Sequence, residues 1–255
     1  MQEKLILVSN DDGYDALGIE ALIDVAKEFG RIVAVAPVEG RSGMSHAISI
    51  KNPLRLNKLW EKENVSMYSC SGTPVDSVKL ALDQVLDRKP DLLVSGINHG
   101  SNASISIIYS GTMGAALEGC INGIPSIGFS VLDHSRNADF TLAKKYARVI
   151  IEKVLQNGLP ENVGLNVNFP VIPENEFKGI KICMQTTGVW KEEFDKRKDP
   201  SKQDYYWLTG FFKNHEPENE TTDEWALTHN YASVVPVKVD FTSYPAIEIL
   251  KSWNL

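Results

Sequence analysis

The stretch Leu5-Ile6-Leu7-Val8-Ser9-Asn10-Asp11-Asp12-Gly13 joins an unbroken apolar run to two acids and a glycine. An apolar run of this kind predicts a strand that is buried on both faces of a parallel sheet. In open α/β sheets the ligand crevice lies beyond the carboxyl ends of such strands. Two adjacent carboxylates repel each other there unless a positive charge lies beside them, so the stretch predicts a cation site.

The same residues also fit a purely structural turn. Asp-Asp-Gly is a favourable turn sequence, and Asn or Asp after a strand commonly caps the next helix. On the acid pair alone, a binding site and a turn are equally good interpretations. The choice between them depends on the rest of the sequence.

Composition narrows the class of protein. A chain of 255 residues suits one large α/β domain, and its 26 basic and 33 acidic residues give a formal charge of -7. No run of Lys or Arg would follow a nucleic-acid backbone, and the three cysteines lack the spacing of a disulfide framework or a zinc site. Without a signal peptide or a run of about 18 apolar residues, we expect a cytoplasmic protein that binds neither nucleic-acid polymers nor membranes.

Strand and helix patterns alternate after the acid pair. Apolar residues at helical spacing predict a helix from Ile19 to Phe29, with Gly30 as its C-cap. Further strands are expected at 32–36, 91–94, 124–130 and 163–169, and further helices at 74–86, 113–119 and 139–157. This alternation predicts a three-layer, Rossmann-like α/β fold with a mostly parallel sheet.

The pattern changes to aromatic and charged stretches near residue 185. We therefore expect a single domain over residues 1–255 in which 185–255 form a β-rich C-terminal arm and tail. Residues 232–239 are predicted to be an edge strand, because Pro236 cannot donate a ladder hydrogen bond. Residues 246–253 are predicted to form a short helix.

Polar side chains gather in three loops at one edge of the predicted sheet. They are all oxygen donors of the kind that magnesium or manganese prefers: Asp11, Asp12, Ser42 and Asn98. For Ser42 and Asn98 a structural role in a glycine-containing turn is about as good an interpretation. His46 and His99 receive no role, because an isolated histidine is more often a surface or hydrogen-bonded residue.

A candidate anion site follows in the chain. Ser110-Gly111-Thr112 stands at the predicted start of a helix, where backbone N–H groups and the helix dipole favour a phosphate. Alone the signal is weak, because Ser and Thr are ordinary helix caps. Next to a metal site, the same Ser-Gly-Thr sequence is a stronger indication of phosphate binding.

Five motifs in one order carry a resemblance to a known family. They are Val8-Ser9-Asn10-Asp11-Asp12-Gly13, Ala36-Pro37 with Ser42-Gly43, Ser71-Gly72-Thr73-Pro74-Val75-Asp76, Ser95-Gly96-Ile97-Asn98-His99-Gly100-Ser101-Asn102 and Tyr109-Ser110-Gly111-Thr112. Over about the first 130 residues the chain resembles SurE, the survival-protein nucleotidases. Looser matches follow at 166–170, 206–208 and 222–223.

The resemblance implies a metal-dependent phosphatase that hydrolyses nucleoside 5′- and 3′-monophosphates through a metal-activated water, with short polyphosphate as a further substrate. It implies one divalent ion per subunit, Mg²⁺, Mn²⁺ or Co²⁺, held by Asp11, Asp12, Ser42 and Asn98, with both aspartates catalytic. The phosphate contacts it implies are Asn10, Asn98, Ser110, Gly111 and Thr112. It also implies a homodimer or homotetramer built through an exchanged C-terminal segment.

Departures from the family pattern lie late in the chain. Gln185-Thr186-Thr187-Gly188 stands where a Thr-Arg pair is frequent, and Asn230 to Pro236 differ from a Gly-Tyr-x-Ser-x-Thr-Pro pattern. These changes bear on the oligomer contacts and base preference that the resemblance implies, and not on the metal chemistry. Two functions are alternatives to a phosphatase: a mononucleotide-binding module without turnover and a receiver-like regulatory module. A receiver needs a phosphorylatable aspartate at the end of its third strand, whereas Val94 here leads to Ser95.

Overall fold

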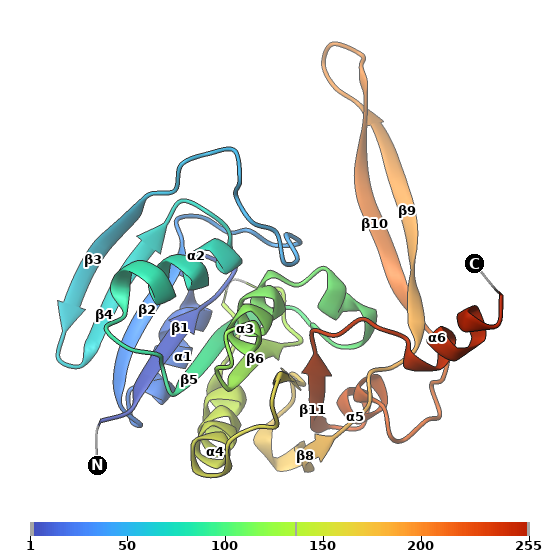
Figure 1. The fold of residues 1–255 in the computed structure, drawn as a ribbon. Coiled ribbons are helices and arrows are strands. Elements are labelled where there is room, and N and C mark those ends of the chain that lie inside the picture. Colours follow the sequence, from blue (N-terminus) through green and yellow to red (C-terminus); the bar gives the residue numbers. More distant parts are fainter. Residues whose placement is uncertain (1–2, 136, 254–255) are drawn as a thin grey trace.

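In residues 3–135 and 137–253, the part of the chain that this computed structural model describes, nine strands form one mixed sheet (Figure 1). Their order across the sheet is β3 (Leu56–Lys62), β4 (Val65–Cys70), β2 (Arg31–Pro37), β1 (Leu5–Ser9), β5 (Leu92–His99), β6 (Ser126–Val131), β7 (Val163–Phe169), β11 (Tyr231–Lys238) and β8 (Gly179–Ile182). Strands β4, β2, β1, β5, β6 and β7 are parallel, while β3 and β11 are antiparallel to β4 and β7.

Helices cover both faces of this sheet. The helices are α1 (Leu17–Ala26), α2 (Pro74–Leu80), α3 (Gly111–Ile121), α4 (Thr141–Asn157), α5 (Asp223–Thr228) and α6 (Tyr244–Lys251). Alternate residues of β1 point to opposite faces: Ile6 and Val8 pack with α1 and α4, and Leu5 and Leu7 pack with α2 and α3. Both faces of β1 are therefore apolar, which explains its unbroken run. The predicted three-layer, mostly parallel α/β fold is confirmed.

The loop after β1 and helix α1 lie close to the neighbouring strand. Gly18 makes this approach possible, because a Cβ at this position would lie 2.0 Å from the carbonyl oxygen of Ile97 in β5. Strand β1 is parallel to both β2 and β5, so the carboxyl ends of all three strands meet at one edge. The loops that follow them are thereby brought together.

Two predictions at the ends of elements are wrong. Gly30 is not a C-cap, because α1 ends at Ala26 and Gly30 instead packs against the backbone, where a Cβ would lie 2.2 Å from the Lys4 carbonyl oxygen. The loop expected from Ser95 is a continuation of β5 as far as His99, with an irregular register against β6 between Ser95 and Asn98.

The prediction of an edge strand near the C-terminus is also wrong. Strand β11 lies between β7 and β8, so it has neighbours on both sides. Strand β8 pairs only with Tyr231 to Val234, and Pro236 lies beyond that pairing. A backbone N–H at position 236 would point to the β8 side of the strand, where no partner strand remains. Proline, which has no N–H, therefore fits at this position.

A separate two-stranded sheet projects from the body (Figure 1). It is the antiparallel hairpin of β9 (Gly188–Lys198) and β10 (Asp204–Asn214), and it agrees with the predicted β-rich arm. The predicted terminal helix is present as α6. Within the described residues, no helix has both the length and the apolar character that a membrane crossing requires.

Candidate active site

The acid pair lies in direct contact with the start of α3. Asp11 is buried, with 3% of its surface exposed, and its Oδ1 accepts a hydrogen bond from the Thr112 hydroxyl. Gly111 leaves room for this contact, because a Cβ there would lie 2.8 Å from the Asp11 Cβ. Two motifs separated by about 100 residues of sequence are thus adjacent in space, as the sequence predicts.

Both acids lie where negative charge is unfavourable. Burial, and secondly the charge of Asp12, raises the pKa of Asp11 to about 7. Burial also raises the pKa of Asp12. No ion pair between either acid and a Lys or Arg is found in the described part of the chain. A cation beside the two carboxyls would therefore stabilise their ionised forms.

Asn10 contributes an unused oxygen at the same turn. It is fully buried, and its Nδ2 donates to the Gly13 carbonyl oxygen at 2.8 Å. Its Oδ1 has no hydrogen-bond partner among the described residues. An orphaned acceptor suits a cation or a water better than a phosphate oxygen, which is also an acceptor.

The loop after β2 brings Ser42 to the acid pair. Arg41 N–H donates to the Asp11 carbonyl oxygen at 2.7 Å, which fixes the loop against the acid turn. Ser42 itself is exposed, and together with Asp12 it lines a cavity of about 640 Å³. Ser42 and Asp12 therefore lie on the wall of the same cavity.

Asn98 is held near the acid pair by the end of β5. Its Nδ2 donates to the Gly100 carbonyl oxygen at 2.8 Å, and the next backbone N–H, that of His99, is 3.4 Å from Asp12 Oδ2. Asn98 is largely buried. The third predicted loop thus reaches the same place as the first two.

The hydroxyls at the start of α3 are already engaged within the protein. Ser110 Oγ accepts from Met113 N–H at 3.0 Å as the helix N-cap, and the Thr112 hydroxyl donates to Asp11. Met113 N–H is therefore taken by the cap, and the Thr112 backbone N–H is engaged by Asp11. The groups left for an anion are the Gly111 N–H and the positive end of the helix dipole. Phosphate binding at this turn would rest mainly on the backbone.

The donor set fits a hard cation. No group of three or more His, Cys, Asp and Glu residues able to hold a metal is found within residues 3–135 and 137–253. The predicted set has only two acids and adds a hydroxyl and an amide: Asp11, Asp12, Ser42 and Asn98. Such oxygen ligands, with the orphaned Asn10 oxygen beside them, are typical of magnesium or manganese sites.

Two histidines on the cavity wall were not predicted as site residues. His99 and His134 line the same cavity as Asp12 and Ser42. The position of His99, directly after Asn98, was a usable signal. His134 follows β6, which is parallel to β5, so the rule that ligands bind at carboxyl ends of strands also covers its loop.

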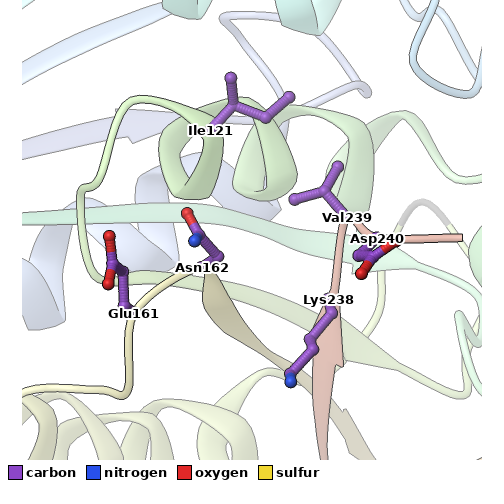
Figure 2. A pocket seen from close by; sticks show the side chains of 6 residues that line it. All are labelled: Ile121, Glu161, Asn162, Lys238, Val239 and Asp240. Carbon is purple, nitrogen blue, oxygen red and sulfur yellow. The ribbon is translucent and has the colours of Figure 1, made fainter. Parts of the chain in front are cut away.

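Other hollows lie away from the acid pair. Figure 2 shows one of about 430 Å³ between the end of α3, the loop before β7 and the segment after β11. Its described lining includes Glu161, Asn162, Lys238 and Asp240 and none of the predicted site residues. An apolar groove of about 940 Å³ runs between α3 and the end of β11, with Ser110 in its wall. Of the three, only the cavity of Asp12 and Ser42 is lined by the acid pair's turn.

Comparison with known proteins identifies the family. The model of the family described as "Survival protein SurE" matches residues 6–192. The chain is 57% identical to "5′-nucleotidase SurE" of Flavobacterium psychrophilum, with 100% of this chain and 99% of that protein covered. It is 54% identical to the protein of the same name from Christiangramia forsetii, with 100% and 98% covered.

A solved structure agrees with these sequence matches. The crystal structure of the SurE protein from Aquifex aeolicus aligns with a TM-score of 0.84 at 38% identity, covering 98% of this chain and 100% of that chain. Fold, sequence and motif order therefore point to the same family. The chain belongs to the SurE family.

Proposed function

We propose that the chain is a divalent-metal-dependent phosphatase that hydrolyses nucleoside 5′- and 3′-monophosphates to nucleoside and inorganic phosphate. The observation that carries this proposal is the contact between the buried Asp11 and the N-terminus of α3, which brings the acid pair next to the positive end of a helix. The names of the similar proteins, "5′-nucleotidase SurE", give independent support.

The metal ligands in this proposal are Asp11, Asp12, Ser42 and Asn98, with one Mg²⁺, Mn²⁺ or Co²⁺ ion per subunit. A divalent ion held there would neutralise phosphate oxygens and lower the pKa of a water. The raised pKa values of Asp11 and Asp12 support the assignment, because a nearby cation favours the ionised carboxylates.

The protein's own groups then position and activate the reactants. The Gly111 N–H at the start of α3 binds a phosphate oxygen, and the Nδ2 groups of Asn10 and Asn98, each of which has a second N–H, contribute further polar contacts. A carboxylate of the acid pair orients the attacking water or takes its proton. Because phosphate monoesters react very slowly without a catalyst, this positioning and charge stabilisation supply most of the rate acceleration.

Phosphate release from a panel of nucleoside monophosphates tests the proposal. With manganese or magnesium present we expect turnover that a chelator abolishes. Asp12→Asn should lower kcat/KM by about 100-fold or more, since it removes one charge from the acid pair. Asp83→Asn, on an exposed helical segment away from this edge of the sheet, is the matched control and should retain full activity.

The same assay separates the alternative functions. Nucleotide and metal binding without phosphate release on any ester would contradict the phosphatase and favour a mononucleotide-binding module. Stable labelling of the protein by a phosphoryl donor would favour a receiver-like module. Release of phosphate from short polyphosphate would extend the substrate range.

We also propose that the active form is a cytoplasmic homodimer or homotetramer that uses the C-terminal segment 185–255. Two features support the assembly. The hairpin of β9 and β10 exposes large apolar side chains, and α6 buries none of its residues in the single chain. A two-stranded hairpin is seldom stable alone in water, so a second copy is the expected cover.

A further inference from the structure

His134 lies at the rim of the cavity that holds the acid pair. It is exposed, and with Asp12 and Ser42 it lines the hollow of about 640 Å³. Its ring is packed over Gly100, because a Cβ on that glycine would lie 2.3 Å from His134 Cε1 and 2.7 Å from its Nδ1. The glycine thus lets the imidazole lie directly against the loop after β5, beside the site.

The imidazole of His134 is available to a substrate. In the described part of the chain, no hydrogen bond or ion pair is found for its ring nitrogens. His99, the other histidine of the cavity, differs: its Nδ1 is buried and its ring packs edge-on against Phe140, with centroids 5.3 Å apart. Of the two histidines that line this cavity, His134 is the exposed one.

The charged groups around His134 are mostly acidic. Asp12, Asp15 and His99 line the same cavity. In its own loop, Asp133 Oδ1 is engaged by the backbone N–H of Ser135 at 2.7 Å. His134 therefore faces a cavity whose other charged groups are mainly carboxylates.

Hydrolysis of a nucleoside monophosphate expels an alkoxide, which is a poor leaving group unless it receives a proton. We propose that His134 is the general acid that protonates the departing nucleoside oxygen. The proposal rests on the proposed phosphatase function and adds a catalytic residue to it. Imidazole is the side chain that most commonly supplies such a proton near neutral pH.

Atoms and charges balance in this step. A water oxygen forms a bond to phosphorus while the bond from phosphorus to the nucleoside oxygen breaks, and the bonding electron pair leaves with that oxygen. The oxygen takes the proton from the His134 imidazolium and leaves as the nucleoside hydroxyl. The proton lost by the attacking water passes to a carboxylate and then to solvent, and solvent reprotonates His134.

The test compares two leaving groups in the intact protein. The variant His134→Gln should lose about 100-fold or more in kcat/KM on nucleoside monophosphates, because a general acid typically contributes about 10² to 10⁴-fold. On 4-nitrophenyl phosphate, whose phenolate leaves without a proton, the same variant should lose less than about threefold.

Two further variants keep the test decisive. His134→Ala should regain nucleotide hydrolysis when imidazole is added, because the position is open to solvent. His215→Gln, at an exposed histidine near the base of the hairpin, is the matched control and should behave as wild type. Equal losses on both esters, or no loss on either, would overturn the assignment of His134. A wild type that hydrolyses neither ester would instead contradict the phosphatase itself.

Discussion

Asp11 and Glu224 share a pKa raised to about 7, but their surroundings differ. Asp11 lies at the edge of the sheet beside a second acid and the start of α3, where a bound cation can offset its charge. Glu224 lies in the first turn of α5, where burial and then the charge of Asp223 raise its pKa. Glu224 has no place in the proposed chemistry, so its raised pKa bears on stability.

Glu224 makes the protein less stable as pH rises through neutrality. An ordinary glutamate ionises near pH 4.5, whereas the folded-state pKa is about 7. The folded state therefore binds the proton more tightly, and this contribution to stability is complete below pH 4.5 and lost as pH rises through 7. At pH 8 the variant Glu224→Gln should be more stable than wild type by about 1 kcal/mol, allowing for partial solvent screening.

Urea unfolding at pH 5 and pH 8 measures this effect. The gain in the unfolding free energy should be present at pH 8 and nearly absent at pH 5. A gain of the same size at both pH values would mean that the Glu224→Gln substitution stabilises α5 for a reason other than lost charge.

Most of the candidate site is predictable from the sequence, because its residues follow strands that local patterns reveal. The acid pair, Ser42 and Asn98 come after apolar runs, and parallel strands place their ends together. The hydrogen bond from Thr112 to Asp11 and the ring of His134 over Gly100 were not predictable. Each joins residues far apart in the chain, and their side-chain directions depend on the packed structure.

Helix α5 and the segment before the hairpin are anchored to the body by one buried carboxylate. Asp223 is fully buried and accepts at Oδ2 from Ser104 N–H at 2.8 Å. Its Oδ1 accepts from Thr186 N–H at 2.9 Å, from the Thr186 hydroxyl at 2.6 Å and from Glu224 N–H at 2.9 Å. Asp223 therefore connects the loop after β5, the start of the arm and α5.

Replacing this carboxylate should weaken all three connections. In Asp223→Asn one acceptor oxygen becomes an amide that faces an N–H donor, so buried polar groups lose their partners. We expect a loss of about 2 to 4 kcal/mol in the free energy of unfolding, measured by urea denaturation. Glu220→Gln, at an exposed acid three residues earlier, should change it by less than about 0.5 kcal/mol. A small loss in Asp223→Asn would show that water replaces the missing acceptor.

The elements that local patterns predict are those with a strong apolar face. Strands β1, β2 and β7 and helix α4 lie close to their expected positions. Strand β3 is almost entirely exposed, so its sequence carries no pattern of burial. The neighbours of β11 are set by pairing with β7 and β8, which the single proline in its sequence does not reveal.

The hairpin offers a test of assembly at the scale of the whole molecule. Phe194 and Leu208 are cross-strand partners and are 62% and 63% exposed. Replacing them by a charged pair, Phe194→Glu with Leu208→Lys, keeps a favourable cross-strand contact but removes apolar surface. We expect sedimentation to show a smaller species than wild type, with unchanged secondary structure by circular dichroism.

A matched exchange elsewhere on the hairpin controls for this change. Lys198 and Asp204 are also cross-strand partners, and they form an ion pair at 2.7 Å. Exchanging the two, Lys198→Asp with Asp204→Lys, should leave the mass unchanged. Equal masses for all three proteins would contradict a role of the apolar hairpin surface in assembly.

The hairpin enters and leaves the body at one point. Gly188 pairs with Asn214, and just outside them His215 N–H donates to the Thr187 carbonyl oxygen at 3.0 Å. Strands β9 and β10 pair with each other and not with the nine-stranded sheet. Insertions, deletions or exchanges within the hairpin would therefore leave the strand order of the main sheet unchanged. They would change only the surface that the hairpin offers to neighbouring molecules.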